Sequence, residues 1–350
     1  MGDIKESLKK AMVDQGWIFG DRATRIGCPF DWTENENKQT IVNLDGLLAV
    51  AFYFSMFYVK KETSPQVLIP GHDEVKKLCY DEMYRIHKHF FPFLPLNDTW
   101  SNYIESQAMI RTQDYCFIKK HCTDLVKGAQ HLDIGPGLGS SAIYSLNLLG
   151  ADFYAVEAHP MSYSVQRNVL RYLSPSPGSY LDAIECENFQ MGTEEIVTLL
   201  KKGSGYRIKH APSWKLPLIG SSSMDLLTAT FVLNELNYAG ILWMLSHASR
   251  TLKRGGYFYI RDSTILKPGM HSIDYDQELT TMGFEKVARL EYTNRLDHYG
   301  IPRVYRKTAD TSYSFEEMVE KCLGKFASVA GGGSRAYNLR ETSVAGGEDR

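Results

Sequence analysis

The sequence has no apolar run long enough to cross a membrane. Its longest such run, residues 47–59, falls short of the about twenty residues that a spanning helix needs, and Lys60 and Lys61 close it. The first residues, 1–7, are charged and lack the apolar segment of a secretory signal. We therefore expect no membrane partner and a cytoplasmic protein.

Paired cysteines are also missing. The six cysteines are scattered over 350 residues and form no Cys-x-x-Cys pair, which is typical of buried thiols in a reducing compartment. Cys116, His121 and Cys122 are close in sequence, but their spacing matches no zinc-ligand pattern. We predict no metal site from them.

A basic excess is lacking as well. The formal net charge is -2, with 39 Lys and Arg against 41 Asp and Glu. Non-specific nucleic-acid binding rests on a basic surface, so the sequence does not predict a nucleic-acid partner.

The pattern of the chain changes twice. Residues 1–125 predict a mainly helical N-terminal domain that caps a substrate site, with amphipathic helices over 73–91 and 100–122. Residues 126–326 alternate short β-rich runs with helices, which favours a parallel α/β sheet. Residues 327–350 are rich in Gly, Ser, Arg and Glu and predict a disordered tail.

Within 126–326 the expected strands cover 131–134, 152–156, 206–210, 224–232, 257–261, 284–292 and 302–308. Helices are expected over 140–149, 160–172, 193–202, 239–252 and up to 283. Two closing strands after five alternating units predict a seven-stranded, mostly parallel Rossmann-like sheet whose last strand is antiparallel.

A glycine-rich segment follows the first expected strand: Asp133-Ile134-Gly135-Pro136-Gly137-Leu138-Gly139. Glycines let a backbone approach a ligand closely, and the helix that follows presents unpaired N–H groups. Dinucleotide enzymes use the spacing G-x-G-x-x-G. Here the spacing is G-x-G-x-G, with Ser140 at the place of the third glycine, which favours a ligand without a pyrophosphate.

This segment resembles the first motif of the class I S-adenosylmethionine (SAM)-dependent methyltransferases. Met224–Leu236 and Lys253–Gly256 resemble two later segments of that family, so the resemblance covers about 129–308. It implies a SAM-binding methyltransferase domain in which Asp133 helps to hold the methionine ammonium. It also implies that Gly135, Pro136, Gly137 and Gly139 line the cofactor.

An acidic residue, Glu157, ends the second expected strand. A carboxylate at this place accepts hydrogen bonds from the ribose hydroxyls of a nucleoside, and Ala158 beside it is expected to line the same site. After the third strand the family places an acid near the adenine, whereas this chain has Ser213 and Trp214. We interpret Ser213 as a hydrogen-bonding partner of the adenine and Trp214 as a stacking one, with a purely supporting tryptophan as the open alternative.

Residues for the methyl acceptor are expected on the loops after the strands and on the N-terminal helices. Candidate catalytic residues are His271, Asp262 and Glu235, and candidate acceptor-binding residues are Asn234, Tyr103, Glu105 and Arg111. His271 has the unperturbed pKa of a general base. Asp262, Glu235 and Asp276 supply oxygen ligands that suit a divalent cation, although no metal motif supports one.

The sequence thus predicts a methyltransferase acting on a small-molecule acceptor, an oxygen of a hydroxylated or sugar-like metabolite. Two alternatives stay open. One is a SAM-binding protein without catalysis that serves as a regulatory or scaffold subunit, and the other is an NAD-dependent oxidoreductase, which the glycine spacing disfavours.

Overall fold

The computed structural model describes residues 67–90, 92, 98–157, 160–188, 191–201, 203–233, 238–262, 275–290, 300–310, 313 and 317. The helices in them are α4 (His72–Phe90), α5 (Asp98–His121), α6 (Ser141–Asn147), α7 (Pro160–Leu173), α8 (Ala183–Asn188), α9 (Thr193–Leu200), α10 (Tyr238–Thr251) and α11 (Tyr275–Thr281). Two short 3-10 helices are η3 (Pro177–Ser179) and η4 (Ser213–Leu218). The strands are β1 (Gln130–Ile134), β2 (Asp152–Glu157), β3 (Tyr180–Asp182), β4 (Ile208–Pro212), β5 (Met224–Thr230), β6 (Leu252–Asp262), β7 (Phe284–Arg289) and β8 (Ile301–Lys307).

These strands form one sheet in the order β3-β4-β2-β1-β5-β6-β8-β7. The pairs from β3 to β6 are all parallel, and β8 runs antiparallel to both β6 and β7. The predicted mostly parallel Rossmann-like sheet with an antiparallel closing strand is confirmed. The short edge strand β3 adds an eighth strand to the seven that the sequence predicts.

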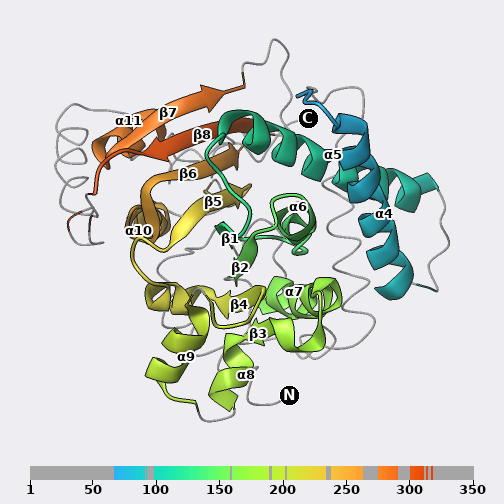
Figure 1. The fold of residues 1–350 in the computed structure, drawn as a ribbon, viewed down its shortest axis with the longest axis horizontal. Coiled ribbons are helices and arrows are strands. Elements are labelled where there is room, and N and C mark those ends of the chain that lie inside the picture. The colour runs from blue at the N-terminus through green and yellow to red at the C-terminus, as the bar shows by residue number, and fades with distance from the viewer. Residues whose placement is uncertain are drawn as a thin grey trace, which may run out of the picture.

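Helices cover both faces of the sheet (Figure 1). Apolar residues of α4 to α7 pack in one buried cluster with sheet residues such as Phe153 and Tyr259. Residues of α8 to α11 form a second buried cluster with Leu132, Ile134 and their neighbours. Successive side chains of a strand point to opposite faces, so His131 and Asp133 of β1 lie on the α4–α7 side.

Charged residues at the helix ends match the helix dipole. Asp73 and Glu74 lie in the first turn of α4, and Lys88 lies in its last turn. Such charges stabilise a helix by about 0.3–1 kcal/mol each. Pro160 opens α7, where its missing N–H costs no helical hydrogen bond.

Two local features differ from the expected pattern. The sequence predicts no helix or strand between 173 and 192, but residues 180–188 form β3 and α8. Asp182 Oδ1 accepts hydrogen bonds from the backbone N–H groups of Ile184 (2.9 Å) and Glu185 (3.3 Å) and so starts the helix. The fifth strand was expected over 257–261, but β6 begins at Leu252, so that Gly255 and Gly256 lie inside the strand. Gly255 has a φ of 82° there, and the register with β5 shifts opposite this stretch.

Two segments singled out in the sequence, the apolar run 47–59 and the tail 327–350, lie outside the described residues. The division into a capping domain and a SAM-binding domain stays a prediction. None of the helices that the structure describes is both long and apolar enough to traverse a bilayer.

Four cysteines in the described ranges, Cys79, Cys116, Cys122 and Cys186, are buried and not in disulfides. Burial raises the pKa of the Cys79 thiol to about 11 and that of Cys116 to about 12. These thiols are therefore protonated at neutral pH and unreactive, as expected for packing residues.

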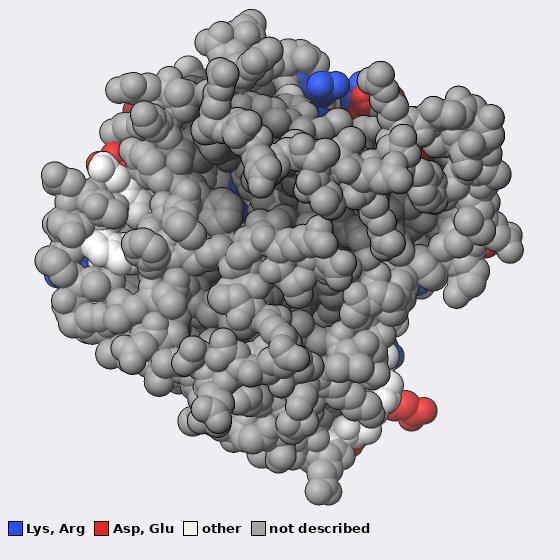
Figure 2. Space-filling model, turned by 180° about the vertical axis from the view of Figure 1, so that it is seen from behind, with Lys and Arg blue, Asp and Glu red and all other residues white. Residues whose placement is uncertain are grey.

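Figure 2 shows the back of the molecule, where the visible described charges lie near the margins and carry both signs. No single sign gathers among them on this face.

Candidate cofactor site

The glycine loop lies at the carboxyl edge of the sheet, directly after β1. Gly135, Gly137 and Gly139 have φ values of 64°, 63° and 77°, in the left-handed region that side chains with a Cβ rarely adopt. The turn is tied to β2 by the Gly135 N–H, which donates to Val156 O at 2.8 Å. The loop needs glycine at these three positions for its backbone conformation.

Two of the glycines are also needed for space. A Cβ on Gly135 would overlap the Cγ2 of Val232, which follows β5. A Cβ on Gly139 would lie 3.0 Å from Leu170 Cδ2 of α7, tighter than ordinary van der Waals contact. The loop is thus held between the exit of β5 and helix α7.

Asp133 lies beneath the loop with 1% of its surface exposed. Ser141 Oγ donates a short hydrogen bond to its Oδ2, and Thr228 Oγ1 donates to its Oδ1 at 2.7 Å. Burial raises the pKa of this carboxyl to about 6. In this arrangement Asp133 joins β1, β5 and α6, and its predicted contact with an ammonium group stays a prediction.

His131, two residues earlier on the same face, supports this arrangement. The single hydroxyl proton of Thr228 is donated to Asp133. In the contact of 2.8 Å with His131 Nε2, Thr228 Oγ1 is therefore the acceptor and Nε2 is the donor. The other ring nitrogen, Nδ1, then accepts from Ser145 Oγ at 2.9 Å. Burial lowers the pKa of His131 to about 3, so the ring is neutral and its proton is on Nε2.

Glu157 ends β2 and is 6% exposed. Its Oε2 accepts a hydrogen bond of 2.6 Å from Gln166 Nε2, and the same nitrogen donates to Gly137 O at 2.6 Å. One amide of α7 therefore bridges the glycine loop and the predicted ribose carboxylate. The sequence analysis missed Gln166, although its place on the helix after the second strand is a local signal that could have indicated it.

The adenine side is only partly described. Pro212 of β4 is the register partner of Glu157, and Ser213 follows it, buried at the start of η4. Ser213 therefore lies at the strand edge next to Glu157, where the sequence analysis expects the nucleobase. The side chain of Trp214 and the whole of Ala158 lie outside the described residues.

The three residues of α5 that are predicted to bind the methyl acceptor differ in burial. Tyr103 and Arg111 are 5% and 9% exposed, whereas Glu105 is exposed. Tyr103 and Arg111 therefore face the interior and Glu105 lies at the surface, and the predicted contact of all three with the methyl acceptor stays a prediction.

Arg111 belongs to a buried group of charges between α5 and the sheet. Its Nη1 lies 3.3 Å from Asp114 Oδ2. Arg261 of β6 pairs with the same carboxylate at 2.6 Å (Nε to Oδ1), and Tyr259 Oη donates to it at 2.5 Å. The guanidinium of Arg261 also lies 4.9 Å from the ring centroid of Phe231.

Phe231, another residue that the sequence did not single out, has a φ of 58° at the exit of β5. Its N–H donates to Arg261 O at 2.8 Å. A non-glycine residue in this conformation is strained by about 1–2 kcal/mol. Val232, which packs on Gly135, comes directly after it, so the strained turn sets the approach of β5 to the glycine loop.

Of the candidate catalytic residues, Asp262 is described and is fully buried at the end of β6. It lies at the same edge of the sheet as the glycine loop. His271, Glu235 and Asn234 lie outside the described residues. Their predicted roles stay predictions.

The described residues contain no group of three or more His, Cys, Asp or Glu side chains arranged for a metal ion. Asp276, one of the carboxylates considered for a cation, lies on α11 and is already bonded. Its Oδ1 accepts from Tyr305 Oη at 2.6 Å, and its Oδ2 pairs with Lys286 at 2.7 Å.

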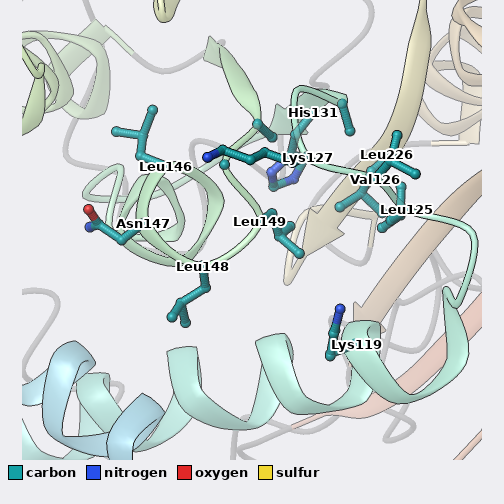
Figure 3. A pocket seen from close by; sticks show the side chains of 13 residues that line it. Lys119, Leu125, Val126, Lys127, His131, Leu146, Asn147, Leu148, Leu149 and Leu226 are labelled. Carbon is teal, nitrogen blue, oxygen red and sulfur yellow. The ribbon is translucent and has the colours of Figure 1, made fainter.

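A separate cavity of about 410 Å³ lies at the opposite, amino-terminal edge of the strands. Its lining includes the starts of β1 and β5, at Ala129, His131 and Leu226. Figure 3 shows Lys119 of α5 pointing toward it and Leu146, Leu148 and Leu149 around it. The cavity is thus distinct from the candidate cofactor site, which is at the carboxyl edge.

Comparison with known proteins gives distant likenesses of fold. No family model matches, and no curated protein matches. A geranyl diphosphate C-methyltransferase from Streptomyces coelicolor A3(2) matches with a TM-score of 0.42 and 9% identity, over 69% of this chain and 99% of its own. A structure from Galdieria sulphuraria named as a sarcosine dimethylglycine methyltransferase has a TM-score of 0.41 and 11% identity, covering 66% and 98%.

The [4+2]-cyclase SpnF matches with a TM-score of 0.40 and 13% identity, over 58% of this chain and 82% of its own. Likenesses this distant carry no argument about what this chain does. The chain's own strand order, its antiparallel closing strands and the glycine loop after β1 form a Rossmann-like fold with a mostly parallel sheet. This is the fold that the sequence resemblance to the class I SAM-dependent methyltransferases implies.

Proposed function

We propose that this protein is a SAM-dependent methyltransferase that methylates an oxygen of a small hydroxylated metabolite. One observation carries the proposal. The G-x-G-x-G loop and the acidic end of β2 converge on a single amide, Gln166 Nε2, which lies 2.6 Å from both Gly137 O and Glu157 Oε2.

This convergence matches the needs of a nucleoside without a pyrophosphate. The glycine loop offers close backbone approach, and the carboxylate of Glu157 offers acceptors for ribose hydroxyls. In the proposed complex Gly135, Pro136, Gly137 and Gly139 line the cofactor. Ser213 and Trp214 are assigned to the adenine, and Asp133 to the methionine end.

The acceptor is assigned to the space beside β6 and the interior face of α5. Tyr103 and Arg111 face inward from α5, and Asp262 ends β6 at the cofactor edge. Asn234, Glu235 and His271 follow the same edge in sequence and complete the proposed site. Glu105 of the same helix is exposed and is assigned to the outer rim of the acceptor site.

SAM supplies the methyl group as an electrophile. When an acceptor oxygen takes it, the C–S bond breaks, S-adenosylhomocysteine (SAH) leaves, and the hydroxyl proton has to be removed. The chain's contribution is to orient the hydroxyl and accept that proton. His271 and the carboxylates Asp262 and Glu235 are the proposed proton acceptors.

Calorimetry with SAM, SAH and NAD tests the cofactor first. We expect SAM and SAH to bind and NAD not to bind. The chain is then incubated with methyl-labelled SAM and a panel of polyhydroxylated and phenolic acceptors, with Gly135→Ala as the matched inactive control. Binding of NAD alone would establish the oxidoreductase, and binding of SAM without transfer to any acceptor class would establish the non-catalytic alternative.

A further inference from the structure

A chain of hydrogen bonds leads from Glu157 into the protein behind the cofactor site. Gln166 of α7 contacts His210 of β4, and His210 contacts Tyr180 of β3. Gln166 and His210 are both 0% exposed. The residues come from three separate elements, so the chain ties α7 to the edge of the sheet.

The amide orientation of Gln166 is fixed by its neighbours. One terminal atom of the Gln166 side chain lies 2.6 Å from the carbonyl oxygen of Gly137 and also 2.6 Å from Glu157 Oε2. A carbonyl and a carboxylate only accept hydrogen bonds. This atom must therefore be the amide nitrogen, whose two protons are both used.

The position of each further proton follows in turn. Gln166 Oε1 accepts, so His210 Nε2, at 3.1 Å, must donate. Burial lowers the pKa of His210 to about 4, so the ring is neutral and its Nδ1 is an acceptor. Tyr180 Oη, at 3.0 Å, therefore donates to Nδ1 rather than to Asp182 Oδ2, which lies farther from it at 3.4 Å.

The ring of His210 is held in this plane. Tyr163 stacks on it with centroids 3.8 Å apart and planes 15° apart. Tyr163 Oη donates to Asp182 Oδ1 at 2.8 Å, which fixes the stacking partner as well. With the ring fixed, the amide of Gln166 has one orientation.

We propose that Gln166 is a positioning residue for Glu157, and that His210 sets its orientation, so that together they determine the preference of the site for an intact ribose. This inference rests on the proposed function, since it takes Glu157 as the ribose ligand. Without the amide, the Glu157 carboxylate loses the hydrogen bond that ties it to the glycine loop. The ribose hydroxyls are then the part of the ligand that loses contact.

The chain itself offers a matched control for Gln166. Gln130 is also buried, its Nε2 donates to Gly128 O (3.4 Å) and Asp152 Oδ2 (3.1 Å), and its Oε1 accepts from Tyr154 Oη (2.9 Å). It lies at the amino-terminal edge of the sheet, away from the glycine loop. Gln130→Met therefore removes a similar buried amide without touching Glu157.

The test measures binding of SAH and of its 2′,3′-dideoxy analogue by calorimetry. We expect Gln166→Met to weaken SAH binding about tenfold, the size of one lost charge-assisted hydrogen bond, with little change for the dideoxy analogue. Gln130→Met should leave both affinities unchanged. In a Glu157→Ala background, Gln166→Met should have no further effect on SAH, because the two residues act through one contact.

His210 is tested with two variants. His210→Phe keeps a ring for stacking but loses the donor, and it should reproduce the loss seen with Gln166→Met. His210→Gln keeps a donor near the place of Nε2, and it should restore most of the preference for SAH over the dideoxy analogue. Melting curves confirm that each variant is folded.

The two possible failures are distinct. If the wild-type chain does not bind SAH, the proposed function is wrong, and the inference falls with it before any variant is made. If the wild type binds SAH but Gln166→Met weakens SAH and the dideoxy analogue equally, Gln166 is only structural and the inference is overturned.

Discussion

Arg261 of β6 and Asp114 of α5 form an ion pair in the interior, with 2.6 Å between Nε and Oδ1 and side-chain exposures of 1% and 0%. The pair joins α5 to β6, and its two residues are 147 positions apart in the sequence. Arg111 contributes a second positive charge at the same carboxylate. The carboxylate of Asp114 thus forms ion pairs with two buried guanidinium groups.

Asp114→Asn should destabilise the protein by about 3–5 kcal/mol, because it removes the carboxylate that pairs with two buried guanidinium groups. Urea denaturation measures the change. Arg254→Ala is the control, since Arg254 and Asp310 pair at 3.4 Å on the surface with 68% and 75% exposure, and such pairs contribute less than about 1 kcal/mol. Equal losses for the two variants would contradict the role assigned to Asp114.

Gly135→Ala should abolish cofactor binding, because the new Cβ has to displace Val232 and the residue has a φ of 64°. Gly203→Ala is the control, because it changes a glycine of positive φ without creating a steric clash. Gly203 has a φ of 80° but nothing within 4 Å of a Cβ, so this change should cost about 1–2 kcal/mol of stability and leave SAH affinity intact. Retained affinity in a folded Gly135→Ala variant would show that the loop does not carry the cofactor.

Stability should rise with pH between about 4 and 6.5 because of the buried histidines. Burial lowers the pKa of His131 to about 3 and those of His210 and His247 to about 4. In this range the unfolded histidines bind protons that the folded ones do not, so unfolding is favoured as the pH falls. Asp133 has the opposite effect, because its pKa is raised to about 6 in the folded protein. Between about pH 4 and 6 its carboxyl is protonated in the folded protein but ionised in the unfolded one, so its contribution to stability falls as the pH rises.

Unfolding midpoints at several pH values between 4 and 7 check this slope. His131→Gln should remove up to about 1.4 kcal/mol per pH unit from it, the contribution of one proton. Asp133→Asn should make the slope steeper, since it removes the opposing group. A slope that both variants leave unchanged would refute the assignment.

Tyr103 has a buried hydroxyl without a hydrogen-bond partner in the described part of the chain. Tyr103→Phe should therefore stabilise the free protein by about 1 kcal/mol, because it removes an unsatisfied polar group. If the hydroxyl serves the acceptor, methyl transfer should fall in the same variant. Thermal melts and the transfer assay, run together, measure both effects, and a loss of stability would show that the hydroxyl is bonded in solution.

The parts of the site that the sequence predicted are those encoded locally. The strand, turn and helix around Gly135 to Gly139 follow from glycine spacing alone, and Glu157 follows from its place after a β-rich run. The closing hairpin was visible as two β-rich runs joined by a loop. Local patterns therefore predicted the sheet and the place of the glycine loop and of Glu157 at its carboxyl edge.

The remaining features depend on contacts between residues that are far apart in the sequence, and local patterns do not predict such contacts. Gln166 meets His210 across 44 residues, and Arg261 meets Asp114 across 147. Glu105 was grouped with Tyr103 and Arg111 because all three lie in one helical segment, but burial of that segment separates them. The strain at Phe231 likewise arises from the packing of β5 on β6.

The bond from Thr228 to Asp133 spans 95 residues, and this has a consequence for biosynthesis. A nascent chain that ends before residue 228 contains β1 and its glycine turn but lacks β5, the neighbour that supplies Val232 and the Thr228 hydroxyl. Non-local pairings of this kind form slowly and late. The glycine turn is therefore completed only after β5 has been synthesised, and fragments that end before residue 228 are expected not to bind SAH.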